Sequence, residues 1–345
     1  MCTTLMRHDV PDRDHDDVTA APRVPVDNPG RKSRPMSAQR EHKGGGILPV
    51  LARRGVAVLA VAALLPYTVL KLLWLGGSQI GMVPGSGPGH MQDARMEIGN
   101  AITVVLAAIG VVVVLALTGR WGQRLPWWTL VIPAAAATGA LAPIALGLPI
   151  GALLQALLEG TVRSGGEGNL TGWVFALVYG GFAVFGIALA LLFADYVSRR
   201  WSPLLDAGPR PPRRRWSRVL TVITFVLFAG AMLFWAFVSG SLRLAGWESV
   251  AQRVVLVVVA LLTLLGCAVL LPPDDRSRHR MRWMLGWIGC CTAAVQGPVM
   301  LLLANDATIN PALLAVTLVA TPAAVWLGLS AIHRTAHVVS SPNEH

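Results

Sequence analysis

The 345-residue chain has little charge, and it lacks the motifs of the common enzyme classes. Charged residues make up only 14% of it and hydrophobic residues 54%, which is outside the usual balance of a soluble globular domain. The patterns G-x-x-x-x-G-K-[ST], H-E-x-x-H and G-x-S-x-G are missing, which argues against a P-loop ATPase, a zinc protease of that class and an α/β-hydrolase. We therefore predict no catalytic residue, metal or cofactor, and we do not expect an enzyme.

Residues that could form disulfides or bind a metal are also few. His8 and His15 lie among aspartates in a polar tail, which lacks the fixed geometry that a metal site needs. His333 and His337 have helical spacing, but no acidic residue lies between them, so structural or surface roles are favoured. Four cysteines are too few for a disulfide framework. Three of them fall in apolar runs, where a thiol is usually a small buried hydrophobe: Cys267, Cys290 and Cys291.

What the chain has in abundance is long apolar runs. Eight of them reach the length of about 20 residues that crosses a bilayer core of roughly 30 Å, so we predict an all-α fold, a polytopic transmembrane bundle within residues 47–332. Residues 1–46 are polar and predict a disordered cytoplasmic tail, and residues 333–345 a cytoplasmic C-terminal tail. The eight predicted spans are 55–76, 97–118, 126–148, 172–196, 219–240, 250–271, 283–304 and 310–332.

The net charge of +11 is unevenly placed along the chain. Outside the spans, 24 lysines and arginines fall in the two tails and alternate loops, and only three fall on the opposite side. Cytoplasmic loops of membrane proteins carry such an excess, so we predict a plasma-membrane protein with both termini in the cytoplasm. Nucleic acid is not an expected partner, because no helix carries a basic face with residues that could read bases.

The third apolar run has the least certain end. Its apolar character continues through residues 150–159, which form either an amphipathic or re-entrant helix on the outer face or the end of one long, tilted helix. Both interpretations stay open. Gly147 and Gly151, four residues apart, favour a close helix contact in this region.

An internal repeat is a further possibility. Arg53 precedes Trp74 by the same spacing with which Arg214 precedes Trp235. Because each half would hold four spans, the halves would be parallel repeats about an axis along the membrane normal. Arginines before a helix and a tryptophan at its far end are also generic interface features, which explain the match equally well. The possible halves are 55–196 and 219–332.

Lys71 is the only lysine or arginine deep within a predicted span. Tyr67, Lys71 and Trp74 share one face of a helix. Lys71 lies roughly 8 Å from the predicted outer end, so its stem can reach the headgroups and anchor the helix there. In the alternative interpretation, Lys71 pairs with Glu97 and closes the outer end of a cavity.

Other polar side chains inside the spans are scarce. Asn100 lies in the second span, and Asp195 lies four residues before Arg199, which predicts an ion pair at the cytoplasmic surface. Gln296 precedes Gly297 and Pro298, a combination that predicts a break in the seventh helix, with an interhelical hydrogen bond as the simpler alternative. The candidate cavity or gate residues are Lys71, Tyr67, Trp74, Glu97 and Gln296.

The stretch LPYTVLKLLWLGGSQIGM, residues 65–82, resembles the first helix of polytopic membrane proteins that are common in high-GC actinobacteria and have no assigned activity. The resemblance covers this segment and the eight-span layout. It implies a membrane protein of the same kind, and it assigns no functional residue.

Two functions are compatible with these features. The protein binds or moves a lipid or hydrophobic small molecule between its halves, or it is a non-catalytic scaffold or accessory subunit for a partner protein. In the second case, the arginine-rich loop at 199–218 would contact anionic lipid or the partner. An intramembrane enzyme is a third possibility with less support, because no acid, base or nucleophile group is visible.

Overall fold

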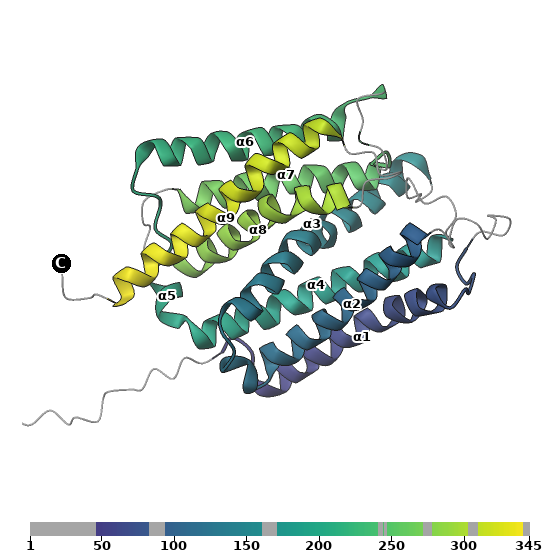
Figure 1. The fold of residues 1–345 in the computed structure, drawn as a ribbon, viewed down its shortest axis with the longest axis horizontal. Helices are drawn as coiled ribbons and strands as arrows, with labels where there is room; N and C mark the ends of the chain where they lie inside the picture. Colours follow the sequence, from purple (N-terminus) through teal and green to yellow (C-terminus); the bar gives the residue numbers. More distant parts are fainter. Residues whose placement is uncertain are drawn as a thin grey trace, which may run out of the picture. The chain divides into compact units, whose positions relative to one another are not determined.

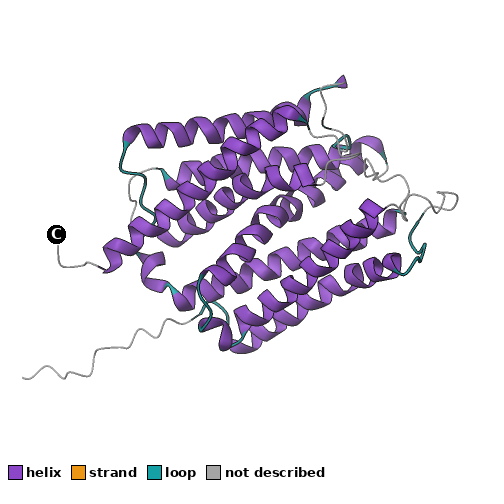
Figure 2. Cartoon of the chain, viewed as in Figure 1, coloured by secondary structure: helices purple, strands orange, loops and turns teal. Residues whose placement is uncertain are grey.

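The computed structural model describes residues 46–82, 94–160, 171–240, 244, 247–271, 278–302 and 310–340. These residues belong to one compact unit, Gly44–His345, and form helices and turns with no strand (Figure 2). Eight helices are long and apolar enough to cross a membrane, and each overlaps one predicted span. The all-α, eight-span prediction is therefore confirmed. The predicted disordered tail lies almost entirely outside the described residues.

The spanning helices differ in length, and the described residues between them include two short helices. The spans are α1 (Val50–Leu75), α2 (Ala94–Thr118), α3 (Trp128–Glu159), α4 (Gly172–Arg200), α6 (Arg215–Phe237), α7 (Val250–Leu270), α8 (His279–Leu302) and α9 (Pro311–Ser340). The short elements are the 3-10 helix η2 (Trp121–Gln123) and α5 (Ser202–Asp206).

The helices form two groups that α3 joins (Figure 1). In the first group, α1 packs along both α2 and α4. In the second group, α6, α7, α8 and α9 pack in sequence, and α9 returns to contact α6. Helix α3 packs along α4 on one side and along α7 and α8 on the other. It therefore links the groups, whereas the sequence placed it simply in the first half.

The predicted parallel repeat is not confirmed. The pairs α1–α2, α1–α4 and α3–α4 pack together, as do the pairs at matching places in the second half, α6–α7, α6–α9 and α8–α9. The correspondence stops at α3, which packs extensively along α7, while its counterpart α8 has no comparable contact with α2 among the described residues.

Helix α3 is continuous through residues 150–159, the segment for which the sequence allowed two interpretations. It runs for 32 residues, about 48 Å at 1.5 Å per residue, so the long-helix interpretation is confirmed and the re-entrant one is wrong. The glycines predicted to allow close packing do so. A Cβ atom added at Gly151 would lie 2.6 Å from the Cα atom of Ala251, and one at Gly147 would lie 2.9 Å from that of Val255. The C-terminal half of α3 is thus held against α7.

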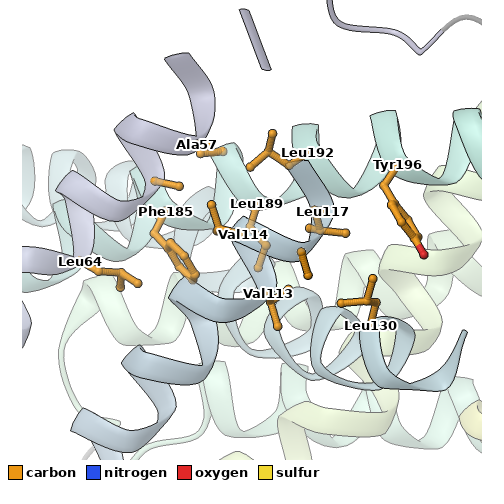
Figure 3. Close-up of a cluster of buried hydrophobic side chains, with 13 residues drawn as sticks. Ala57, Leu64, Val113, Val114, Leu117, Leu130, Phe185, Leu189, Leu192 and Tyr196 are labelled. Carbon is orange, nitrogen blue, oxygen red and sulfur yellow. The ribbon is translucent and has the colours of Figure 1, made fainter. Parts of the chain in front are cut away.

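The first group has a core of its own, drawn in Figure 3. Side chains from α1, α2 and α4 meet there, and α3 adds Leu130 at one edge. Close approach of backbones makes this possible, because a Cβ atom at Gly181 of α4 would lie 2.7 Å from the carbonyl oxygen of Ala63 in α1. The core fixes α1, which carries Lys71, against its neighbours. Its larger members are Leu64, Val113, Val114, Leu117, Phe185, Leu189, Leu192 and Tyr196.

Candidate functional site

The Lys71 ammonium occupies a defined position between α1 and α2. Its Nζ donates a hydrogen bond to Oδ1 of Asn100 at 2.7 Å. It also lies 4.7 Å from the ring centroid of Trp74 and 5.5 Å from that of Tyr67, within the range of cation–π attraction. The lysine side chain is half-buried, so part of it is still accessible from outside the helix group.

The two aromatic rings beside Lys71 are themselves fixed. The indole Nε1 of Trp74 donates to the backbone oxygen of Ile80 at 2.9 Å, just beyond the end of α1. The ring of Tyr67 packs against Phe182 of α4, with 4.7 Å between ring centroids. Both aromatic residues are buried. The position of the ammonium is therefore set by contacts from α1, α2 and α4 together.

On α2, the hydrogen-bond partner of Lys71 is Asn100, whereas the sequence suggested Glu97. Glu97 lies one turn earlier on the same helix and is exposed, whereas Asn100 is 4% exposed. The predicted gate between Lys71 and Glu97 stays a prediction, because the hydrogen bond from Lys71 to α2 goes to Asn100. The signal that identifies Asn100 is its position one turn into the span from Glu97, level with Lys71.

Gln296 lies in the other helix group and does not share a site with Lys71. It is 2% exposed in α8, and its Oε1 has no hydrogen-bond partner among the described residues. Helix α8 packs on α3, α7 and α9, whereas Lys71 lies on α1 and is bonded to Asn100 of α2. A buried acceptor without a partner costs about 1–3 kcal/mol, so this side chain needs a physical explanation.

The predicted break at Gln296 is wrong, because α8 continues through Pro298. A proline inside a helix frees the carbonyl four residues earlier, here that of Ala294. The hydroxyl of Thr321 in α9 donates to that oxygen at 2.9 Å. The neighbouring helix thus satisfies the freed group and lets α8 run on without a break.

Asp195 forms the centre of a buried ionic cluster near the start of α1. Its carboxylate accepts from Nε of Arg53 at 2.7 Å, from Nε of Arg199 at 3.0 Å and from the backbone N–H of Leu48 at 2.9 Å. Arg199 also donates to the carbonyl of Leu117 at the end of α2. The predicted ion pair is confirmed, and its carboxylate is fully buried within the protein rather than exposed. The other arginine bonded to Asp195 is Arg53, which lies 142 residues earlier in the chain.

This end of the molecule, where α1 and α6 begin and α4 ends, is called the arginine-rich end below. Several of its arginines are committed to the fold. Arg200 donates to the hydroxyl of Tyr196 and, at 3.0 Å, to the carbonyl of Leu125. Arg282 donates to the carbonyl of Val269 at 3.0 Å. These guanidinium groups bond to carbonyls at or near the ends of neighbouring helices.

Four other arginines at the same end are exposed. They lie between α5 and the first turn of α6 and are followed by Trp216, which is 62% exposed. Together they form an arginine strip, defined as Arg210, Arg213, Arg214, Arg215 and Trp216. A cluster of cations beside an exposed indole is typical of a surface at the membrane–water interface.

Metal-binding and thiol groups fall outside these sites. Within the described ranges, no three His, Cys, Asp or Glu side chains lie close enough to hold a metal ion together. His333 and His337 lie 3.2 Å apart, measured between their Nε2 atoms, on an exposed part of α9. His8 and His15 lie outside the described residues. The predicted burial of the membrane thiols is confirmed for Cys267, Cys290 and Cys291.

No protein-family model, no curated protein sequence and no solved structure matches the chain.

Proposed function

We propose that this multi-pass membrane protein binds or moves a lipid or hydrophobic small molecule, and that Lys71 engages an acidic headgroup. The observation that carries the proposal is the Lys71 ammonium, held 2.7 Å from Oδ1 of Asn100 and next to two fixed aromatic rings. Helix α1 ends four residues later at Leu75, about 6 Å along the axis. An ammonium at this depth attracts a phosphate or carboxylate at the membrane surface.

The surroundings of Lys71 suit the apolar part of such a ligand. Leu72 of α1, next to Lys71, is 53% exposed, and Val104 of α2, one turn from Asn100, is half-buried. An acyl chain can lie along these side chains while its headgroup contacts the ammonium. A cation beside an exposed apolar surface is what an acidic amphipathic ligand requires.

Lys71→Met tests this role. Native mass spectrometry of the delipidated full-length protein, titrated with phosphatidylglycerol and with phosphatidylcholine, measures each affinity. We expect wild type to prefer phosphatidylglycerol, and Lys71→Met to bind it about fivefold more weakly, since one cation near a membrane surface contributes about 1 kcal/mol. The affinity for phosphatidylcholine should not change.

Arg253→Met is the matched control. Arg253 is a half-buried cation near the start of α7, and its Nε donates to the carbonyl of Ala236. Because that side chain links α7 to α6, we expect its loss to leave phosphatidylglycerol binding unchanged. If Lys71→Met is folded and binds phosphatidylglycerol like wild type, Lys71 is only an interface anchor and the proposal is wrong.

A second role, that of a non-catalytic scaffold or accessory subunit, is favoured by the arginine strip. Its four exposed guanidinium groups suit the anionic lipids of a cytoplasmic leaflet, or an acidic surface of a partner protein. We propose that this end faces the cytoplasm of the cell membrane, in line with the excess of arginines at that end of the spans. The strip then holds the protein at that surface, and a partner would assemble beside it.

Replacing the four arginines of the strip by glutamine should weaken the stabilisation of the protein by phosphatidylglycerol. The measurement is the midpoint of thermal unfolding in nanodiscs with increasing phosphatidylglycerol content. We expect most of the lipid-dependent rise in midpoint to be lost, because each cation contributes about 1 kcal/mol. The control replaces four exposed arginines elsewhere at the same end: Arg54, Arg120, Arg124 and Arg278. An equal loss in the control would show that charge alone, and not the strip, is responsible.

A further inference from the structure

Four buried side-chain oxygens of the second helix group have no hydrogen-bond partner among the described residues. They belong to Thr263 of α7, Thr292 and Gln296 of α8, and Thr317 of α9. Their exposed fractions are 5% or less. Several other threonines in the spans donate to the carbonyl four residues earlier, as Thr68 does to that of Leu64 and Thr221 to that of Ser217. The unpartnered oxygens are therefore not a general property of threonine in this bundle.

Two of the four lie at one level between α7 and α8. The helices cross in contact at Gly266 and Gly289, where a Cβ atom added to Gly289 would lie 2.4 Å from the Cα atom of Gly266. They run antiparallel, because Leu270 on α7 packs at Gly286 on α8. Thr263 and Thr292 each lie three residues from the crossing in the same direction, about 4.5 Å along the axes.

The other two oxygens lie one turn further along. Gln296 follows Thr292 by four residues and shares its side of α8. The hydroxyl oxygen of Thr317 would lie 2.4 Å from a Cβ atom added at Gly297, so α9 places it against the same turn of α8. The four oxygens thus occupy about two helical turns of the second group.

The neutral side-chain oxygens of this cluster suit an uncharged ligand such as water. The amide oxygen accepts hydrogen bonds, and each hydroxyl both donates and accepts. An ion held by neutral side chains alone would stay uncompensated in an apolar interior, whereas a water molecule makes about three hydrogen bonds to such groups. We propose that Thr263, Thr292, Gln296 and Thr317 hold ordered water inside the second helix group. This site is separate from Lys71, so either proposal can fail without the other.

Water-edited solid-state NMR of the full-length, threonine-labelled protein in nanodiscs tests the proposal. Magnetisation from water should reach Thr263, Thr292 and Thr317 several-fold faster than Thr221. Thr221 is the matched internal control because it is equally buried, at 3% exposed, and its hydroxyl is bonded to Ser217. Equal transfer rates at all four threonines would overturn the proposal.

Gln296→Leu provides a second measurement. We expect this substitution to slow the transfer at Thr292 toward the rate of Thr221, because it removes one of the polar groups that hold the water. Unchanged chemical shifts at Thr221 show that the bundle is intact. An unchanged rate at Thr292 in the folded variant would contradict the placement of water beside Gln296. If the variant does not fold, the comparison among wild-type threonines decides the question alone.

Discussion

Replacing Asp195 by asparagine is expected to destabilise the protein by about 3–5 kcal/mol, the usual cost of removing one partner of a buried ion pair. The carboxylate is fully buried and accepts from Arg53, Arg199 and the backbone of Leu48. Asparagine leaves two guanidinium groups without their counter-charge. Unfolding of the purified protein in mixed micelles with increasing SDS, followed by circular dichroism, measures the change.

The matched control is Asp206→Asn. Asp206 also pairs with an arginine, Arg280 at 3.0 Å, but both side chains are more than half exposed. An exposed pair contributes less than about 1 kcal/mol, so this variant should unfold almost like wild type. Similar losses in the two variants would show that burial does not determine the role of Asp195.

Two arginines that were counted as signals of membrane orientation, Arg53 and Arg199, also bond to Asp195. Arg53 ties the beginning of α1 to α4 through Asp195, and Arg199 links the same carboxylate to the end of α2 at Leu117. One acidic group therefore holds three helices together at the arginine-rich end. Two of the arginines counted there have a packing role in addition to any effect on orientation.

The spans and the local contacts were predictable, because short-range physics determines them. A bilayer requires about 20 apolar residues for each crossing, and this requirement is visible in composition alone. The pair of Asp195 and Arg199 follows from helical spacing. A close helix contact at Gly147 and Gly151 follows from small residues four positions apart, although the spacing does not indicate that α7 is the partner.

Contacts between distant helices could not be predicted in the same way. In lipid, every outer face of a span is apolar, so hydropathy does not indicate which faces meet. The position of α3 between the groups and the bond from Lys71 to Asn100 depend on such contacts. The continuity of α8 depends on Thr321, which belongs to another helix and satisfies the carbonyl that Pro298 frees.

Replacing Gly289 by alanine is expected to destabilise the protein by about 2–3 kcal/mol, near the upper range for overpacking. The added Cβ atom would lie 2.4 Å from the Cα atom of Gly266 and 2.5 Å from the carbonyl oxygen of Leu262. Both are backbone atoms of α7, so no side chain can rotate away and the helices must separate. The midpoint of unfolding with SDS measures the loss.

Gly230→Ala is the control with the opposite expected sign. Gly230 lies in α6, and a Cβ atom added there has no neighbour within 4 Å among the described residues. Alanine favours the helix over glycine by up to about 1 kcal/mol, so this variant should be as stable as wild type or more stable. Helix propensity alone would make both substitutions stabilising. A lower midpoint of SDS unfolding only for Gly289→Ala would therefore show that the lost stability comes from the backbone contact between α7 and α8. Equal midpoints for the two variants would show that α7 and α8 are not held together at that crossing.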